Sequence, residues 1–199
     1  MEKCKFMKKI LLIGGGGHCK SVIDVIEQQG LFEIEGIIDK PELLESEVLG
    51  YPVIGNDSDL VEYSKIYKYA LITVGQIKSP NLRIKLFNLA LESGYKLPTI
   101  ISPRSYVSKH AVVGKGSVIM HDVLINANAK IGDNCIINSK ALIEHDSIIK
   151  SHCHISTGSI VNGGSMIQEE VFCGSNTTVI ESTNIPSRRF IGAGLVVKK

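Results

Sequence analysis

His145 and Asp146 form the pair of adjacent side chains best suited to chemistry in this 199-residue sequence. A neutral imidazole, with an ordinary pKa near 6.5, can take a proton from an amine or hydroxyl as that group attacks an acyl carbon. A neighbouring carboxylate raises the basicity of the ring and fixes its tautomer. The same pair stands at His121 and Asp122, 24 residues earlier. Since charged pairs on turns are often simply solvated, the motif alone does not choose between these positions.

A glycine-rich loop, Gly14 to Gly17, follows an apolar segment and precedes a helical pattern from Cys19 to Gln29. Backbone amides at a helix start, together with the helix dipole, bind phosphate groups. The Walker loop and the dinucleotide fingerprint both fail here, because Cys19 stands where each requires glycine. The loop indicates a phosphate-bearing ligand, and a purely structural turn is the alternative.

The second half of the chain has a period of six residues, which runs from Ile101 to Val196 as sixteen hexads. Fifteen of the sixteen first positions are Ile or Val, and fourteen fifth positions hold Ser, Thr, Ala, Val or Cys. A coil of three short strands and three turns has this period, with the branched residue inward and the small one near the turn. Stacking at about 4.8 Å per coil predicts a rod about 25 Å long. Cys135, Cys153 and Cys173 occupy such positions, so we expect them to be buried packing residues.

The first half alternates strand-like and helix-like segments, an order typical of a parallel sheet with crossover helices. Strands are expected at Lys8–Gly14, Glu33–Asp39 and Tyr69–Gly75. Helices are expected at Cys19–Gln29, ended by Gly30, and from Pro80 to Gly94, capped by Ser79, with Leu82, Leu86 and Leu89 inward. We therefore predict an α/β Rossmann-like half-domain over residues 1–98 and a parallel β-helix over 99–199.

Charge and cysteine content exclude several classes of protein. The 22 basic and 20 acidic residues leave a net charge of +2, so neither nucleic acid nor an anionic membrane is implied as a partner. Five cysteines without paired spacings argue against a disulfide framework. The apolar run from Ile10 to Gly17 is too short to insert in a bilayer, and no cleavage site follows it. We expect a cytoplasmic protein.

The glycine loop with His18, Asp39 within GIIDK, and the hexad pair from Glu144 to His154 together resemble one family. These features, spread over residues 9–197, are similar to the bacterial nucleotide-sugar acetyltransferases with a left-handed hexapeptide β-helix. That family includes enzymes that N-acetylate UDP-4-amino sugars and sialic acid O-acetyltransferase-like proteins. The resemblance implies acetyl-CoA-dependent N-acetylation of a nucleotide-linked amino sugar.

The resemblance also implies roles for particular residues. His145 would be the general base, and Asp146, where many members have Glu, would increase its basicity. Acetyl-CoA would contact His154, Ser175 and Ala193. The nucleotide sugar would contact Gly16, Gly17, His18, Asp39, Lys40 and Gly75, with Asn138 near the sugar.

By the same resemblance, three chains would associate as a homotrimer with acetyl-CoA between neighbouring rods. The chain departs from the family at Gln76, where many members have Asn, and at Lys140, where glycine is frequent. The usual segment near the CoA adenine is also lacking, so we expect either weaker binding of the cofactor or a substitute role for Arg188, Arg189, Lys198 and Lys199.

Three other functions are compatible with this fold. A sugar O-acetyltransferase would keep the site and change the acceptor, and a binding module would use the β-helix without catalysis. A zinc hydrolyase of the carbonic anhydrase kind needs three imidazoles, two of them five residues apart, and no pair of histidines here has that spacing. We expect no metal. No Ser or Cys nucleophile stands beside a base in a recognisable catalytic motif, which favours direct attack on the thioester.

Overall fold

The computed structural model describes residues 7–198. Over that range, no helix combines the length and apolar character that crossing a bilayer requires. The chain divides into two compact units, one of Met1–Gly75 with Leu86–Pro98 and one of Gln76–Lys85 with Thr99–Lys199. The segment 76–85 therefore groups with the hexad repeat, although it lies within the first half of the sequence.

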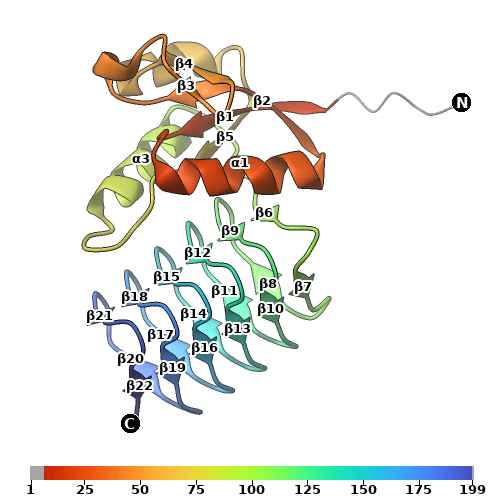
Figure 1. The fold of residues 1–199 in the computed structure, drawn as a ribbon, viewed down its shortest axis with the longest axis vertical. Coiled ribbons are helices and arrows are strands. Elements are labelled where there is room, and N and C mark those ends of the chain that lie inside the picture. Colours follow the sequence, from red (N-terminus) through yellow and green to blue (C-terminus); the bar gives the residue numbers. More distant parts are fainter. Residues whose placement is uncertain (1–6, 199) are drawn as a thin grey trace, which may run out of the picture. The chain divides into compact units, whose positions relative to one another are not determined.

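A five-stranded sheet forms the centre of the first unit (Figure 1). Its strands are β1 (Lys8–Ile13), β2 (Phe32–Ile38), β3 (Glu47–Val48), β4 (Tyr51–Gly55) and β5 (Tyr69–Ile72), in the order β3-β4-β2-β1-β5. Strand β1 pairs in parallel with β2 and β5, and β2 pairs in parallel with β4, whereas β3 is antiparallel to β4. The parallel core is as predicted. The sequence reading missed β3 and β4, which are too short to show a clear alternation.

The helices within the described residues are α1 (Gly17–Gln29), α2 (Leu60–Ser64) and α3 (Asn81–Glu92), with 3-10 turns η1 (Pro41–Leu43) and η2 (Asp57–Asp59). Helix α1 begins two residues earlier than predicted and ends as predicted, because Gly30 adopts φ 63° and its N–H donates to the Ile26 carbonyl. Helix α3 begins at Asn81, whose N–H donates to Ser79 Oγ at 3.2 Å. The predicted cap is therefore present, one residue from the predicted start.

The inward face of α3 differs from the prediction at its first turn. Leu82 is 53% exposed, while Arg83 is 1% exposed and Leu86 is buried. Leu89 is partly buried against the core of the first unit. The residues of α3 up to Lys85 belong to the second unit, and those from Leu86 onward belong to the first. The buried face of the first turn therefore differs from that of the later turns. The regular spacing of leucines in the sequence predicts one buried face along the whole helix and gives no sign of this difference.

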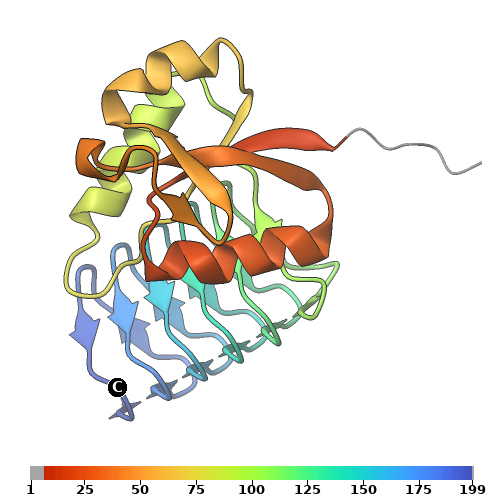
Figure 2. The ribbon, with the colours of Figure 1, turned by 45° about the horizontal axis from the view of Figure 1, so that its top comes forward.

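The second unit is a parallel β-helix of seventeen two-residue strands (Figure 2). Sheet 1 contains β6 (Ile100–Ile101), β9 (Val118–Ile119), β12 (Ile136–Ile137), β15 (His154–Ile155), β18 (Phe172–Cys173) and β21 (Phe190–Ile191). Sheet 2 contains β7 (Tyr106–Val107), β10 (Leu124–Ile125), β13 (Leu142–Ile143), β16 (Ile160–Val161), β19 (Thr178–Val179) and β22 (Val196–Val197). Sheet 3 contains β8 (Val112–Val113), β11 (Lys130–Ile131), β14 (Ile148–Ile149), β17 (Met166–Ile167) and β20 (Asn184–Ile185).

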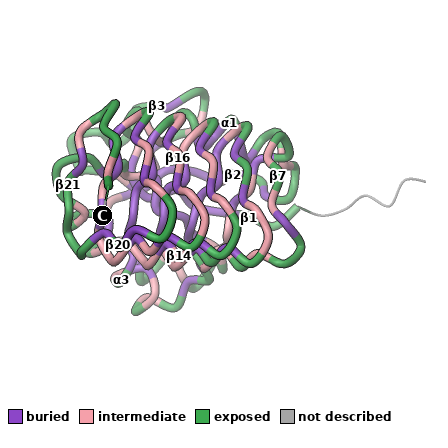
Figure 3. Tube along the Cα trace, turned by 90° about the horizontal axis from the view of Figure 1, so that it is seen from below, coloured by how far each residue is buried: buried purple, intermediate pink, exposed green. Residues whose placement is uncertain are grey.

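The first hexad position points into this β-helix and the fifth closes each turn. Ile, Val and Cys173 at first positions form one continuous buried cluster, which Figure 3 shows as buried segments repeated on each coil. Most hydroxyls and thiols at fifth positions donate to the carbonyl fifteen residues onward, as from Ser147 Oγ to Asn162 at 3.0 Å and from Cys153 Sγ to Gln168 at 2.9 Å. The small residue is thus selected for a hydrogen bond between coils as well as for size.

Each coil has three corners, named here by the sheets they join. Corner 1–2 holds turns such as 120–123 and 138–141, corner 2–3 holds 126–129, 144–147 and 162–165, and corner 3–1 holds 132–135 and 150–153. Every sixth residue from Gly116 to Gly194 has a left-handed φ between 54° and 72°. Lys140, where the family favours glycine, adopts this conformation with φ 61°. Because the coils stack in register, residues eighteen apart lie next to each other.

Candidate functional site

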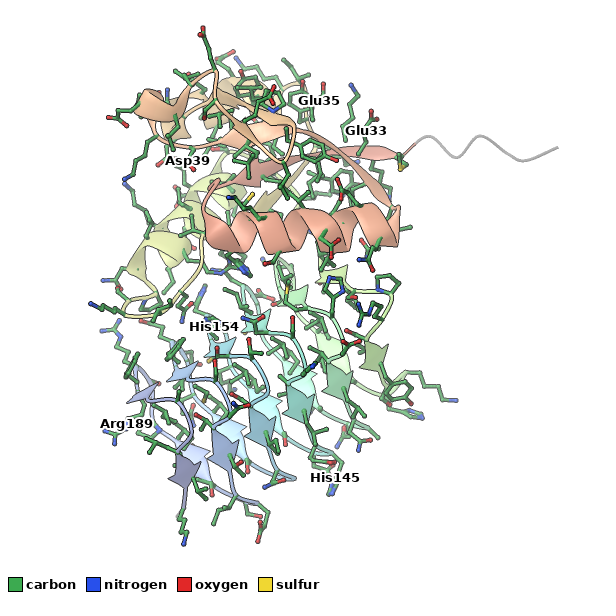
Figure 4. All side chains as sticks on the ribbon, in the orientation of Figure 1. Glu33, Glu35, Asp39, His145, His154 and Arg189 are labelled. Atoms are coloured by element: carbon green, nitrogen blue, oxygen red, sulfur yellow. The ribbon has the colours of Figure 1, made fainter. Side chains whose placement is uncertain are left out.

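His145 and Asp146 lie on corner 2–3, between β13 and β14, and Figure 4 shows His145 projecting into solvent. His145 Nδ1 and Asp146 Oδ2 are 2.7 Å apart, and the side chains are 64% and 55% exposed. The other carboxylate oxygen, Oδ1, accepts a hydrogen bond of 2.7 Å from Asn128 Nδ2 one coil earlier. Since a carboxylate only accepts, the Nδ1 of the ring carries the proton and Nε2 is left as the base.

The electrostatics of this corner favour a basic imidazole. The hydrogen bond and the charge of Asp146 raise the pKa of His145, and Glu144 adds to this effect. The hydrogen bonds from Asn128 and His145 lower the pKa of Asp146, so its carboxylate stays ionised. A ring with this partner takes up a proton more readily than a free histidine.

Gly163 provides the surface on which the ring of His145 rests. It lies one coil after His145, and a Cβ at this position would come within 2.9 Å of the ring Cε1 and 3.0 Å of Nε2. Any larger residue would push the imidazole away. The sequence analysis did not single out Gly163, although a search eighteen residues from His145 would have found it.

The matching pair at His121 and Asp122 lies on corner 1–2, where an arginine binds the carboxylate. Asp122 binds Arg104 through both oxygens, at 3.0 and 2.8 Å from Nη2. His121 Nδ1 lies 2.7 Å from Ser102 Oγ. The same two residues in sequence therefore have different partners, because the coil beneath supplies an arginine here and an asparagine at corner 2–3.

His154 lies on strand β15 of sheet 1 and is only 7% exposed. Its Nδ1 lies 2.5 Å from the Gln76 carbonyl oxygen, and its Nε2 lies 3.3 Å from Asn138 Nδ2. A carbonyl only accepts, so Nδ1 carries the proton and Nε2 accepts from Asn138. Burial lowers the pKa of His154 to about 4, so the ring is neutral near pH 7. The Nε2 of His154 therefore accepts a hydrogen bond, and the ring is a poor base.

Gln76 and Arg83 position the segment 76–85 against this part of the β-helix. Gln76 Nε2 donates to the His152 carbonyl at 2.8 Å, and Arg83, which is buried, lies 3.4 Å from the Asn134 carbonyl. Burial lowers the pKa of Arg83 to about 10. Sequence reasoning missed Arg83, because nothing in a single chain marks an arginine as buried.

The predicted site residues of the β-helix other than His145, Asp146 and His154 lie on corner 1–2. Asn138, Ser175 and Ala193 are on three turns of this corner, and Ser175 Oγ lies 3.1 Å from Ser156 Oγ. Asn138, expected near the sugar, contacts His154, expected at acetyl-CoA. His145 belongs to the other edge of sheet 2, so one chain does not bring it together with these residues.

A cavity of about 250 Å³ opens beside His154, between the segment 76–81 and the last coils. Its walls include Lys78, Arg188, Arg189, Phe172 and Phe190. The two phenylalanine rings stack at 5.0 Å, and Arg188 pairs with a glutamate, Glu170. Phe190 is 54% exposed and is the last ring of this ladder. An open aromatic face beside cationic groups suits a planar ring that carries phosphate.

In the first unit, Asp39 organises the glycine loop. Its Oδ2 accepts from the Gly15 N–H at 2.5 Å and its Oδ1 from the Lys40 N–H at 2.7 Å. Gly16 is the N-cap of α1 and offers no side-chain cap. A Cβ at Gly75 would lie 3.4 Å from the Cβ of His18, so these two predicted residues are neighbours. The uncapped start of α1 has the geometry that binds phosphate.

The four cysteines of residues 7–198 are free and buried. Cys135, Cys153 and Cys173 are buried as predicted, and Cys19 is buried in the first unit. Burial raises the pKa of Cys19 to about 11 and that of Cys173 to about 12. Within residues 7–198, no three His, Cys, Asp or Glu side chains gather closely enough to hold a metal ion.

Two family models match the chain. Residues 9–89 match the PglD N-terminal domain, and residues 110–145 match the bacterial transferase hexapeptide of six repeats. The first match lies in the N-terminal half of the chain, and the second lies within the hexad repeat.

Solved structures extend the likeness over nearly the whole chain. PerB from Caulobacter crescentus, in complex with CoA and GDP-perosamine, is 33% identical with a TM-score of 0.88, covering 96% of this chain and 89% of its own. The acetyltransferase domain of PglB from Neisseria gonorrhoeae, in complex with acetyl coenzyme A, is 30% identical with a TM-score of 0.89, covering 96% and 91%.

A curated relative shares only part of its length with this chain. Uncharacterized protein L142 of Acanthamoeba polyphaga mimivirus is 30% identical over 124 residues, which is 62% of this chain. The chain spans 24% of the length of that relative.

Proposed function

Because this chain belongs to the PglD-like nucleotide-sugar N-acetyltransferases with hexapeptide repeats, we propose that it transfers an acetyl group from acetyl-CoA to the amino group of a nucleotide-linked sugar. The observation that carries this proposal is the dyad on corner 2–3, in which Asp146 accepts from His145 Nδ1 and leaves Nε2 as a base. A structure of perosamine N-acetyltransferase from Caulobacter crescentus, with CoA and GDP-perosamine bound, carries a histidine-to-asparagine substitution.

The proposed reaction is a direct attack of the sugar nitrogen on the thioester carbon. His145 Nε2 accepts the amine proton as the C–N bond forms, and Asp146 stabilises the resulting imidazolium. The tetrahedral intermediate then expels the CoA sulfur, which takes the proton from the imidazolium. Atoms and charges balance without an acyl-enzyme, in keeping with the pKa of the buried thiols Cys19 and Cys173, which burial raises.

We assign the sugar nucleotide to the first unit and acetyl-CoA to corner 1–2. The start of α1, with Gly16, Gly17 and His18, would hold the phosphates, beside Asp39, Lys40 and Gly75. His154, Ser175 and Ala193 would line the acetyl-CoA site, where the neutral His154 accepts from Asn138. The cavity with Phe190 and Arg189 would receive the nucleotide end of CoA.

We further propose a homotrimer. The outward face of sheet 2 is apolar, with Tyr106 61%, Leu124 39% and Val196 59% exposed. This sheet separates corner 1–2 from corner 2–3, so a neighbouring chain packed on it would bring His145 to the acetyl-CoA site. Light scattering of the purified protein should give three times the chain mass, and a stable monomer with full activity would overturn the assignment.

The buried free thiols are consistent with a reducing compartment, and we propose that the protein acts in the cytoplasm. Cell fractionation tests this, and recovery in an oxidising compartment would contradict it.

The experiment that tests the proposed activity is a panel of nucleotide amino sugars with acetyl-CoA, read by thiol release and by the mass of the product. We expect acetylation of at least one amino sugar nucleotide and none of its hydroxyl counterpart. Acetylation of a hydroxyl sugar instead would change the acceptor class, and binding of acetyl-CoA without turnover of any sugar would point to a binding protein.

A further inference from the structure

Asn128 is linked to the catalytic corner by two short hydrogen bonds in series. Its Nδ2 donates to Asp146 Oδ1 at 2.7 Å, and Asp146 Oδ2 accepts from His145 Nδ1 at 2.7 Å. Both oxygens of the carboxylate are therefore engaged, one by each neighbour. The carboxylate of an exposed aspartate otherwise rotates freely, so the amide defines which way Asp146 faces.

The backbone explains why Asn128 reaches Asp146. The two residues are eighteen apart, one full coil, and both adopt the left-handed turn conformation with φ 60°. In-register stacking places them one above the other at the strand spacing of about 4.8 Å. Asn also tolerates this conformation better than most residues.

Comparison with the other corners shows what is particular about an amide here. At corner 1–2, the residue stacked near Asp122 is Arg104, and at corner 3–1 Glu170 binds Arg188. A guanidinium neutralises its carboxylate, which leaves little charge to act on a third group. At corner 2–3, the uncharged amide of Asn128 orders Asp146 and keeps its negative charge available to His145.

No other basic group competes for this carboxylate on the three turns concerned. Residues 126–129, 144–147 and 162–165 contain Glu144, His145 and Asp146 as their only titratable side chains besides hydroxyls. Glu144 is held in the same way, by Asn126 Nδ2 at 2.9 Å. The adjoining strands of sheets 2 and 3 add one charged residue, Lys130 on β11.

We propose that Asn128 is a positioning residue, which fixes the Asp146 carboxylate against His145 Nδ1 and thereby sets the basicity and orientation of the imidazole. The inference rests on the proposed function, because Asn128 acts through His145 and touches no substrate. Asn128 also lowers the pKa of Asp146, which keeps the carboxylate ionised throughout the working range.

The test is an NMR titration of the His145 ring in the whole protein without substrate. In Asn128→Gly, glycine accepts the left-handed turn, so only the amide is removed. The pKa of His145 should fall toward its ordinary value, by less than in Asp146→Asn. In Asn128→Arg, the added cation should neutralise Asp146 and lower the pKa further. Ser182→Gly, at the same turn position of the same corner three coils later, is the matched control and should leave the titration unchanged.

Turnover provides a second readout, with an expected loss in kcat of about two- to tenfold for Asn128→Gly. The acidic limb of the rate profile should move to lower pH together with the NMR titration. An unchanged or raised pKa of His145 in Asn128→Gly would overturn the proposal, as would a loss that is equal at every pH and follows the melting temperature.

The titration also separates this proposal from the proposed function. If His145→Ala retains turnover, His145 is not the base, whereas the pKa of the wild-type ring still reports whether Asn128 acts on the dyad. If His145→Ala is inactive and Asn128→Gly leaves the pKa of His145 unchanged, His145 is retained as the base and the positioning role of Asn128 is rejected.

Discussion

Two of the imidazoles in the β-helix, those of His145 and His154, both carry a proton on Nδ1 but have opposite acid–base properties. His145 is exposed at a corner and bonded to a carboxylate, which raises its pKa. His154 is buried on sheet 1 and bonded to a backbone carbonyl, and burial lowers its pKa to about 4. The partner and the solvent, not the residue type, decide which ring can act as a base.

The sharpest test of this comparison is removal of the exposed ring. His145→Ala should lower kcat on the order of 10² to 10⁴-fold, because the amine proton then has no acceptor. The melting temperature should not change, since the side chain is 64% exposed. Steady-state kinetics with a nucleotide amino sugar checks this, and near-normal turnover would remove His145 as the base.

The buried ring of His154 should make the stability of the folded protein depend on pH in the acidic range. His154 binds a proton with a pKa of about 4 in the folded protein and near 6.5 when unfolded, so the unfolded chain binds more protons between these values. The free energy of unfolding should therefore decrease by about 3 kcal/mol as the pH falls from 6.5 to 4. Urea unfolding of the wild type and of His154→Gln at several pH values measures this.

The variant is the control for the other groups that titrate in this range. Glutamine retains a donor for the Gln76 carbonyl and cannot be protonated, so its stability should vary less with pH. Equal slopes in the two proteins would mean that His154 is accessible to protons in the folded state, and the contrast between the two rings would disappear.

Substitution of Gly163 should have a smaller effect, because it displaces the imidazole of His145 without removing it. Gly163→Ala places a methyl group about 2.9 Å from the His145 ring, which must move. We expect a loss of kcat on the order of tenfold from misplacement of the base. In a His145→Ala background the same change should have no further effect. An equal loss in both backgrounds would show that Gly163 acts independently of the ring.

The smallest effect is expected at the cavity beside His154. Arg189→Ala should raise the KM for acetyl-CoA about two- to tenfold and leave kcat unchanged, because one phosphate contact is lost. Arg104→Ala removes an arginine that pairs with Asp122 near the other end of the β-helix, and serves as the control. A rise in the KM for the sugar nucleotide would reassign the cavity, and no change in either KM would exclude both roles.

The sequence by itself determined the β-helix, since Ile and Val at every sixth residue satisfy no other regular structure. It also determined the helix ends at Gly30 and Gly94, where only a residue with a left-handed φ stops the helix. These features depend on local conformation and on a repeat, both of which a single chain displays. The short strands β3 and β4 and the first-turn face of α3 depend on long-range packing and were missed.

Only the tertiary structure separated His145–Asp146 from His121–Asp122, which are identical as a motif. The choice depends on residues one coil away, Asn128 and Gly163 at one corner and Arg104 at the other. It likewise decided that His154 is buried and neutral under Gln76, 78 residues earlier in the chain. A proton affinity is set by burial and by the partners that folding brings together, and neither is written in the adjacent residues.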